Sequence, residues 1–107
     1  MAEHTLRAEL QVAADHPCLP GHFPGRPLVP AVLLLQRVAE AAAPSLPACR
    51  LTRVARAKFL RPVTPDQVLV LSLSVDADRR RVRFNCSSGD KLVARGELHF
   101  VERRDAR

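Results

Sequence analysis

The sequence contains no tryptophan, no tyrosine and only four phenylalanines among its 107 residues. Proteins that bind single-stranded nucleic acid stack bases on aromatic side chains, so this composition disfavours that class. The chain also lacks the spacing of a zinc finger or a helix-turn-helix motif. Its formal net charge of +6 attracts anions of any kind. We expect no nucleic acid partner, and we interpret the arginines either as a solvated surface or as a contact for an acidic protein.

Long hydrophobic runs are absent as well. No stretch approaches the roughly 18 apolar residues that a membrane-spanning helix needs. The first residues, MAEHTLRAELQV, alternate between polar and apolar side chains, whereas a secretion signal has a continuous apolar segment. We therefore expect no membrane span and a cytoplasmic location.

Cysteine is also rare, with three residues at Cys18, Cys49 and Cys86. An odd number without close pairing predicts reduced thiols, no disulfide and no metal site. His4, near the start of the chain, and His99, on the polar side of the last predicted strand, are interpreted as solvated side chains and not as metal ligands.

Apolar residues make up 47% of the chain, which suits one domain over residues 1–107 with its core between about 5 and 101. Residues 5–13 alternate polar and apolar side chains, as a half-buried strand does. A segment rich in proline and glycine follows, in which long regular structure is excluded. Residues 30–43 then have helix-forming side chains, a proline at the first turn and a stop at Pro44. The first half of this helix is apolar on nearly every side, which predicts that it is buried.

The second half of the chain is predicted to form three or four antiparallel strands. Residues 67–76 alternate strictly, and so do residues 81–86, where Val82, Phe84 and Cys86 share one side. Turn signals lie at 64–66, 76–78 and 89–90. A sheet of this length buries one apolar helix only by curling around it, so the predicted class is α+β with a curved antiparallel sheet around a central helix.

Two motifs give this order of elements a family resemblance. The segments HPCLPGHFPGRPLVPAVLL and KFLRPVTPD, with the elements between them, resemble the hotdog-fold 3-hydroxyacyl-acyl-carrier-protein dehydratases, the FabZ and FabA group with its compact aryl-polyene-type relatives. The resemblance extends from about Thr5 to Val101. It implies a hotdog fold and the conversion of 3-hydroxyacyl thioesters into trans-2-enoyl thioesters, in fatty-acid or polyene-type biosynthesis.

The resemblance makes His22 the catalytic histidine. Imidazole titrates near neutrality, as a general base must, and the neighbouring prolines stiffen the loop that holds the ring. By the same resemblance, the carbonyl of Leu28 accepts the Nδ1 proton, and the backbone N–H of Ala31 holds the thioester oxygen. An N–H at a helix start suits that task because it has no intrahelical partner. The residues implied to contact the substrate are Phe23, Leu28, Ala31, Val32, Leu33 and Leu35.

Gln36 departs from the family pattern. The family has a carboxylate fourteen residues after the histidine, where it helps the hydroxyl group leave as water, and glutamine has no titrating proton to give. Three interpretations stay open at this point. His22 shuttles the proton alone while Gln36 orients the leaving water, or Glu40 one turn later replaces the acid. Alternatively, the chain has lost dehydration and serves as an acyl- or carrier-binding subunit, with thioesterase chemistry as a further possibility.

The expected partners follow from the fold and the charge. An exposed edge strand and a half-covered helix predict at least a homodimer. The resemblance implies an acidic acyl carrier protein, and Arg56, Lys58 and Arg61 are the candidates to bind it. No cofactor or metal is expected, because the substrate arrives on the phosphopantetheine of the carrier and the elimination needs only proton transfer and charge stabilisation.

Overall fold

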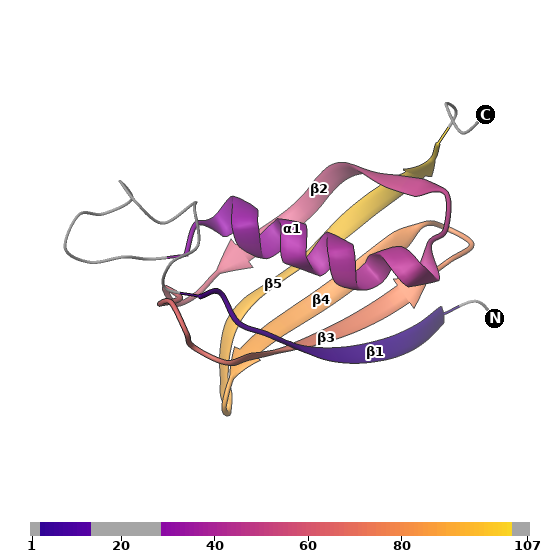
Figure 1. Cartoon of the computed structure of the whole chain (residues 1–107). Coiled ribbons are helices and arrows are strands. Elements are labelled where there is room, and N and C mark those ends of the chain that lie inside the picture. The colour runs from indigo at the N-terminus through magenta and orange to yellow at the C-terminus, as the bar shows by residue number, and fades with distance from the viewer. Residues whose placement is uncertain (1–2, 14–28, 104–107) are drawn as a thin grey trace.

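The computed structural model describes residues 3–13 and 29–103 of the chain. This part forms one antiparallel sheet and one main helix (Figure 1). The elements are β1 (Glu3–Leu10), α1 (Ala31–Ala42), the short 3₁₀ helix η1 (Ala43–Ser45), β2 (Cys49–Phe59), β3 (Leu69–Asp76), β4 (Arg81–Ser88) and β5 (Lys91–Glu102). The strand order is β1-β3-β4-β5-β2, so β1 and β2 are the two edges. Figure 1 shows the sheet curving around α1, as the sequence predicts.

The helix and the first strand differ slightly from their predicted bounds. Strand β1 begins at Glu3 and ends at Leu10, earlier than predicted at both ends. Pro30 is the N-cap of α1 and not its first residue, and the helix ends at Ala42. Pro44 does not end the helical conformation, because it lies in the first turn of the 3₁₀ helix η1. The backbone N–H that proline lacks would have no helical acceptor there.

The central strands confirm the predicted alternation. Every second residue of β3 is buried, and in β4 the same alternation runs from Arg81 to Cys86. The inward-facing side chains are Leu69, Leu71, Leu73, Val75, Val82, Phe84 and Cys86. With β5 they form the core against which α1 packs.

Within the part of the chain that the structure describes, helix α1 packs against the sheet with one of its sides. Its buried residues are Leu33, Leu34, Val38 and Ala42. Val32 is 64% exposed, so the prediction that the first half of the helix is buried on all sides is wrong at this residue. The physical reason is that a single sheet packs against a single face of the helix, and among residues 3–13 and 29–103 no second layer covers the opposite face.

Strand β2 departs from regular pairing at two places. Its register with β5 shifts between Leu51 and Arg53 and again between Val54 and Arg56. Each shift adds one residue to β2, which bends the strand and increases the twist of the sheet at this edge. The neighbouring strand β5 has a glycine, Gly96, next to the second shift. Because Gly96 has no side chain, there is room for the backbone carbonyl of Arg56.

Candidate active site at the start of helix α1

The start of α1 is held by the segment that follows β2. The backbone N–H of Val29 donates to the carbonyl oxygen of Val63 at 2.8 Å, and Val63 is itself buried. The N–H groups of Leu33 and Leu34 donate to the carbonyl of Pro30 at 3.1 and 3.3 Å, which closes the first turn. The helix therefore begins at a position that the sheet determines.

Among the described residues, no side chain caps the first amides of α1. The N-cap residue Pro30 makes no side-chain capping bond, and the first turn contains no acidic residue. The first N–H groups of a helix have no intrahelical acceptor and lie at the positive end of the helix dipole. Ala31, the first residue of α1, is exposed. A backbone N–H at this position suits a negatively charged oxygen, and the role predicted for Ala31 stays a prediction.

Gln36 lies on the exposed face of α1, one turn after Val32 and one turn before Glu40. Glu40 is 69% exposed on its side chain and its carboxylate lies 3.9 Å from the guanidinium of Arg37. The carboxylate of Glu40, the nearest to Gln36 along this face, therefore forms an ion pair with Arg37 of the same helix.

The predicted substrate-contacting residues divide into three groups. Leu33 is 4% exposed and belongs to the core, whereas Leu35 is half-buried and Val32 is largely exposed. Ala31 and Gln36 are exposed. His22, Phe23 and Leu28 lie outside the described residues, so their predicted roles stay predictions.

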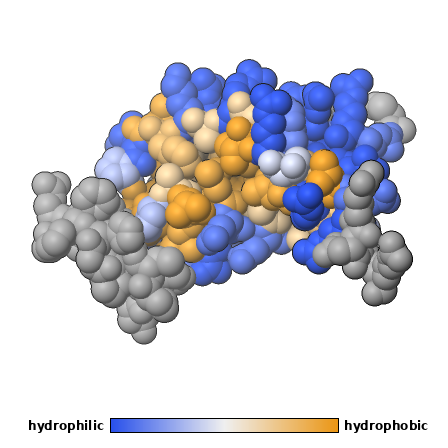
Figure 2. Space-filling model, turned by 90° about the horizontal axis from the view of Figure 1, so that it is seen from above, coloured by the Kyte–Doolittle hydropathy of each residue, from blue (hydrophilic) through white to orange (hydrophobic). Residues whose placement is uncertain are grey.

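An apolar surface adjoins this helix face. Val54 and Phe59 of β2 are paired with the inward-facing residues Leu98 and Ala94, yet they are 41% and 39% exposed. Leu60, directly after β2, is 47% exposed. Figure 2 shows a band of hydrophobic residues across this side of the molecule, bordered by hydrophilic residues. The edge strand thus presents apolar side chains that α1 does not cover.

The basic residues predicted to bind a carrier are all exposed. Arg56, with a side chain that is 80% exposed, lies 3.6 Å from the carboxylate of Glu97, and Lys58 and Arg61 also face solvent. Glu97 accepts a second contact, because Nε2 of His99 lies 2.6 Å from its Oε2. The hydrogen bond from His99 lowers the pKa of Glu97, and the positive charges of Arg56 and Arg81 lower it further.

His99 therefore differs from its prediction. It lies on the outer side of β5 as expected, but its side chain is only 21% exposed and contacts Glu97, so it is not a freely solvated histidine. Arg81 and Arg83 of β4 and Arg95 of β5 were not predicted as site residues. Strand β4 lies next to β5, and β5 lies next to β2. The alternation of charged residues in 81–83 and 95–97 was the available signal.

Metal and membrane sites are not apparent in the part of the chain that the structure describes. Residues 3–13 and 29–103 contain no group of three or more histidine, cysteine, aspartate or glutamate residues arranged to hold a metal ion. Within the same residues, no helix has the length and apolar character to cross a membrane.

An antiparallel sheet curled around one helix is the architecture of the hotdog fold, and solved structures confirm it. The chain resembles the dehydratase heterocomplex ApeI:P of Xenorhabdus doucetiae with a TM-score of 0.84 and 24% identity, covering 92% of this chain and 88% of that one. It resembles an uncharacterized protein of Erwinia carotovora with a TM-score of 0.81 and 25% identity, covering 95% and 86%. At this level of identity the first likeness establishes the fold alone.

Sequence comparison establishes the family. The ApeI-like family, described as ApeI dehydratase, matches residues 1–97. The 3-hydroxyacyl-acyl-carrier-protein dehydratase FabZ of Chlamydia trachomatis is 33% identical over 107 aligned residues, which cover 88% of this chain and 70% of that protein. FabZ of Verminephrobacter eiseniae is also 33% identical, with 87% and 71% covered. The chain belongs to the ApeI-like dehydratase family, and it is a dehydratase of the FabZ and ApeI type.

Proposed function

We propose that this chain removes water from 3-hydroxyacyl thioesters of acyl carrier protein and gives trans-2-enoyl thioesters, in fatty-acid or polyene-type biosynthesis. The family match over residues 1–97 carries this proposal. The start of α1, where Pro30 supplies no side-chain cap, supports it, because dehydration of a thioester needs donors for the oxygen on which negative charge develops.

The reaction assigns one task to each of three groups. His22 takes a proton from C2 of the substrate, and the backbone N–H of Ala31 holds the thioester oxygen while charge accumulates there. The C3–O bond then breaks as the double bond forms between C2 and C3. The hydroxyl group leaves as water with the proton that His22 returns. No cofactor is needed. The proton from C2 leaves with the hydroxyl group as water, and the electron pair of the broken C–H bond forms the new double bond.

Gln36 orients the leaving hydroxyl group in this proposal. An amide donates and accepts hydrogen bonds, but it supplies no proton. A missing general acid costs about 10²- to 10⁴-fold in rate, so this chain is expected to be a slow dehydratase or one whose substrate eliminates easily. The ion pair of Glu40 with Arg37 argues against Glu40 as a replacement acid.

A second candidate function rests on the same residue. If dehydration requires the carboxylate, the chain is an acyl- or carrier-binding subunit that works beside a second hotdog chain. The solved ApeI:P structure of Xenorhabdus doucetiae is itself a heterocomplex, which supports pairing of unlike chains as an arrangement for this fold. A hotdog thioesterase remains the other alternative, in which water attacks the thioester carbonyl.

Pairing of two chains is part of the proposal in either case. The exposed apolar side chains of Val54 and Phe59 lie on an edge strand whose outer backbone groups lack a neighbouring strand within the described residues. Such an edge is commonly covered by a second copy, so we expect a homodimer. We also expect the protein to work in the cytoplasm.

The test is a conversion assay with purified protein. A 3-hydroxyacyl thioester is offered on acyl carrier protein and on pantetheine, and the conjugated enoyl product is followed by its ultraviolet absorbance. We expect slow conversion by the wild-type chain and none by His22→Ala. Release of free thiol without enoyl product would indicate a thioesterase, and binding of the carrier without any product would indicate the binding subunit.

A further inference from the structure

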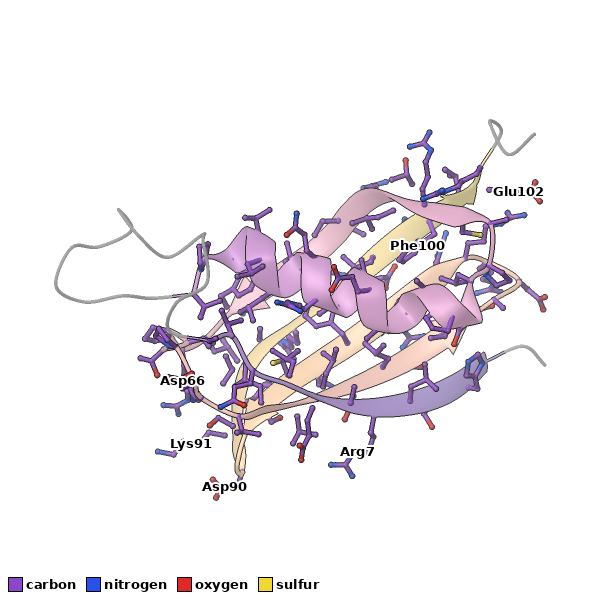
Figure 3. The ribbon with its side chains drawn as sticks, viewed as in Figure 1. Arg7, Asp66, Asp90, Lys91, Phe100 and Glu102 are labelled. Carbon is purple, nitrogen blue, oxygen red and sulfur yellow. The ribbon has the colours of Figure 1, made fainter. Side chains whose placement is uncertain are left out.

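The chain between β2 and β3 makes a tight turn over residues 64–67, which we call the 64–67 turn. The backbone N–H of Gln67 donates to the carbonyl of Thr64 at 3.4 Å, and Asp66 has a φ of 65°. A proline at the second position, here Pro65, followed by a residue with positive φ is the pattern of a type II turn. Figure 3 shows Asp66 at the end of the molecule at which α1 begins. The turn therefore lies at the same end of the sheet as the candidate active site.

The peptide group that joins Val63 to Thr64, called here the 63–64 peptide group, is hydrogen-bonded at both of its polar atoms. Its carbonyl oxygen accepts the N–H of Val29 at 2.8 Å, and its own N–H donates to Oε1 of Gln67 at 3.1 Å. Because a peptide group is planar, its N–H and its carbonyl cannot rotate independently. The side chain that fixes the direction of this N–H therefore also fixes the carbonyl that holds Val29.

The side chain of Gln67 is itself fixed by β4. Its Nε2 donates to Oγ of Ser88 at 2.8 Å, and both residues are half-buried. Oε1 of Gln67 also lies 3.4 Å from the hydroxyl oxygen of Thr64, which donates to it. A backbone N–H only donates, so the amide of Gln67 must present its oxygen to Thr64 and its nitrogen to Ser88. Gln67 thus connects the last residue of β4 to the 63–64 peptide group.

Three amide groups therefore form one chain of hydrogen bonds between the start of α1 and β4. The N–H of Val29 donates to the 63–64 peptide group, that group donates to the amide of Gln67, and this amide donates to Ser88. Aligned amides polarise one another, which strengthens each bond in such a chain. The end at α1 is shielded from water, because Val29 is 7% exposed and Val63 is 3% exposed. Removing the amide of Gln67 would therefore weaken the buried bond that holds Val29.

The backbone on either side of Val29 carries the predicted catalytic contacts. Leu28 lies outside the described residues, but its carbonyl belongs to the same peptide group as the N–H of Val29. This carbonyl is the predicted acceptor for His22, and the N–H of Ala31, two residues after Val29, is predicted to hold the thioester oxygen. We propose that Gln67 is a positioning residue for dehydration, which acts through the 63–64 peptide group on the backbone that supports both contacts; this inference rests on the proposed function.

A second glutamine holds the same turn from another side. Nε2 of Gln11 donates to the carbonyl of Asp66 at 2.7 Å, and the N–H of Asp66 donates to the carbonyl of Val12 at 2.7 Å. Gln11 therefore connects the turn to the chain directly after β1, and its bond goes to Asp66 and not to the 63–64 peptide group. Replacing glutamine by methionine removes the amide and keeps an unbranched side chain of similar length. Gln67→Met and Gln11→Met are thus a matched pair of variants.

The first test measures the hydrogen bond of Val29 directly. Exchange of backbone N–H groups with deuterium is followed by NMR in the wild type, Gln67→Met and Gln11→Met, with the N–H of the buried Leu73 in β3 as the reference for global unfolding. We expect Gln67→Met to speed exchange at Val29 about tenfold relative to Leu73, and Gln11→Met to change it less than about twofold. Equal relative exchange at Val29 in the wild type and Gln67→Met would overturn the inference.

The second test measures kcat and KM with the pantetheine thioester. We expect Gln67→Met to lower kcat about tenfold and to change KM less than about twofold, because displaced groups slow the chemical step more than they weaken binding. Gln67→Glu is expected to retain kcat within about twofold, since a carboxylate accepts from Thr64 and the hydroxyl of Ser88 rotates to donate to it. Gln11→Met is expected to leave kcat unchanged. An equal loss of kcat in Gln67→Met and Gln11→Met would show that only the stability of the turn matters, and it would overturn the inference.

The two tests separate this inference from the proposed function, because amide exchange needs no substrate. If the wild-type chain converts no thioester, the dehydratase proposal fails, and exchange at Val29 still decides whether Gln67 holds the start of α1. If the wild type converts the thioester and Gln67→Met has the same kcat, the dehydratase proposal stands and the positioning role of Gln67 is wrong.

Discussion

Gly96 lies directly opposite Phe84 across β4 and β5, and the aromatic ring occupies the space that a side chain at position 96 would need. A Cβ atom there would lie 2.8 Å from Cε2 of Phe84 and would also collide with the backbone carbonyl of Arg56. The glycine therefore permits two features at once, the packing of a buried phenylalanine and the bulge that turns Arg56 outward.

Gly96→Ala is expected to destabilise the fold. The carbonyl of Arg56 is backbone and cannot rotate away, so relief requires movement of β2 against β5. Overpacking of this kind costs about 1–3 kcal/mol in the free energy of unfolding, which denaturant titration measures. Ser74→Ala, on the outer side of β3, serves as the control and is expected to change little. An unchanged unfolding midpoint for Gly96→Ala would contradict the described close approach.

The pKa of Glu97 predicts how stability depends on pH. The hydrogen bond from His99, with the charges of Arg56 and Arg81, lowers the pKa of Glu97 in the folded chain. A carboxyl group with a lowered pKa stabilises the folded state above its unfolded value of about 4.3, and this contribution is lost as the pH falls through the folded pKa. Arg83 and Arg95 line the same groove as Glu97.

Glu97→Gln is therefore expected to lower the free energy of unfolding at neutral pH. The difference is expected to shrink as the pH falls below about 4.3, because the unfolded chain protonates Glu97 first, and to vanish once the pH is below the lowered pKa of the folded chain. Urea titrations of both proteins between pH 3 and 7 measure the difference. A difference that stays constant over this range would mean that the charge of Glu97 contributes nothing.

Val54→Glu tests the pairing of two chains through β2. Val54 is 41% exposed on the apolar side of this edge strand, and a carboxylate would be buried without a partner at the expected interface. Sedimentation equilibrium is expected to give twice the 11.8 kDa chain mass for the wild type and a lower average mass for the variant. Val68→Glu is the matched control, because Val68 is 50% exposed but precedes β3. Equal masses for both variants would exclude β2 from the interface.

The sequence was sufficient for the elements whose burial follows a simple period. Strict alternation identified β3 and β4 correctly, including the inward side of Val82 and Phe84. The turn at 89–90 was also predictable, since Gly89 has a φ of 61° that favours glycine. In these segments, local chemistry and tertiary packing require the same pattern.

The remaining features depend on distant parts of the chain. The opposition of Lys58 and Arg95 follows from two register shifts that the alternation of β2 does not reveal. The exposure of Val32 depends on how many layers cover α1, which the apolar character of the helix could not indicate.

The central claim is that the exposed face of α1 at Gln36 acts on the leaving hydroxyl group of a 3-hydroxyacyl thioester. The most direct measurement compares the dehydration rates of the wild type, Gln36→Glu and Glu40→Gln with the pantetheine substrate. We predict a gain of about 10²- to 10⁴-fold for Gln36→Glu, because a positioned general acid is restored, and an unchanged rate for Glu40→Gln. No gain from Gln36→Glu, or loss of the wild-type rate in Glu40→Gln, would contradict the account.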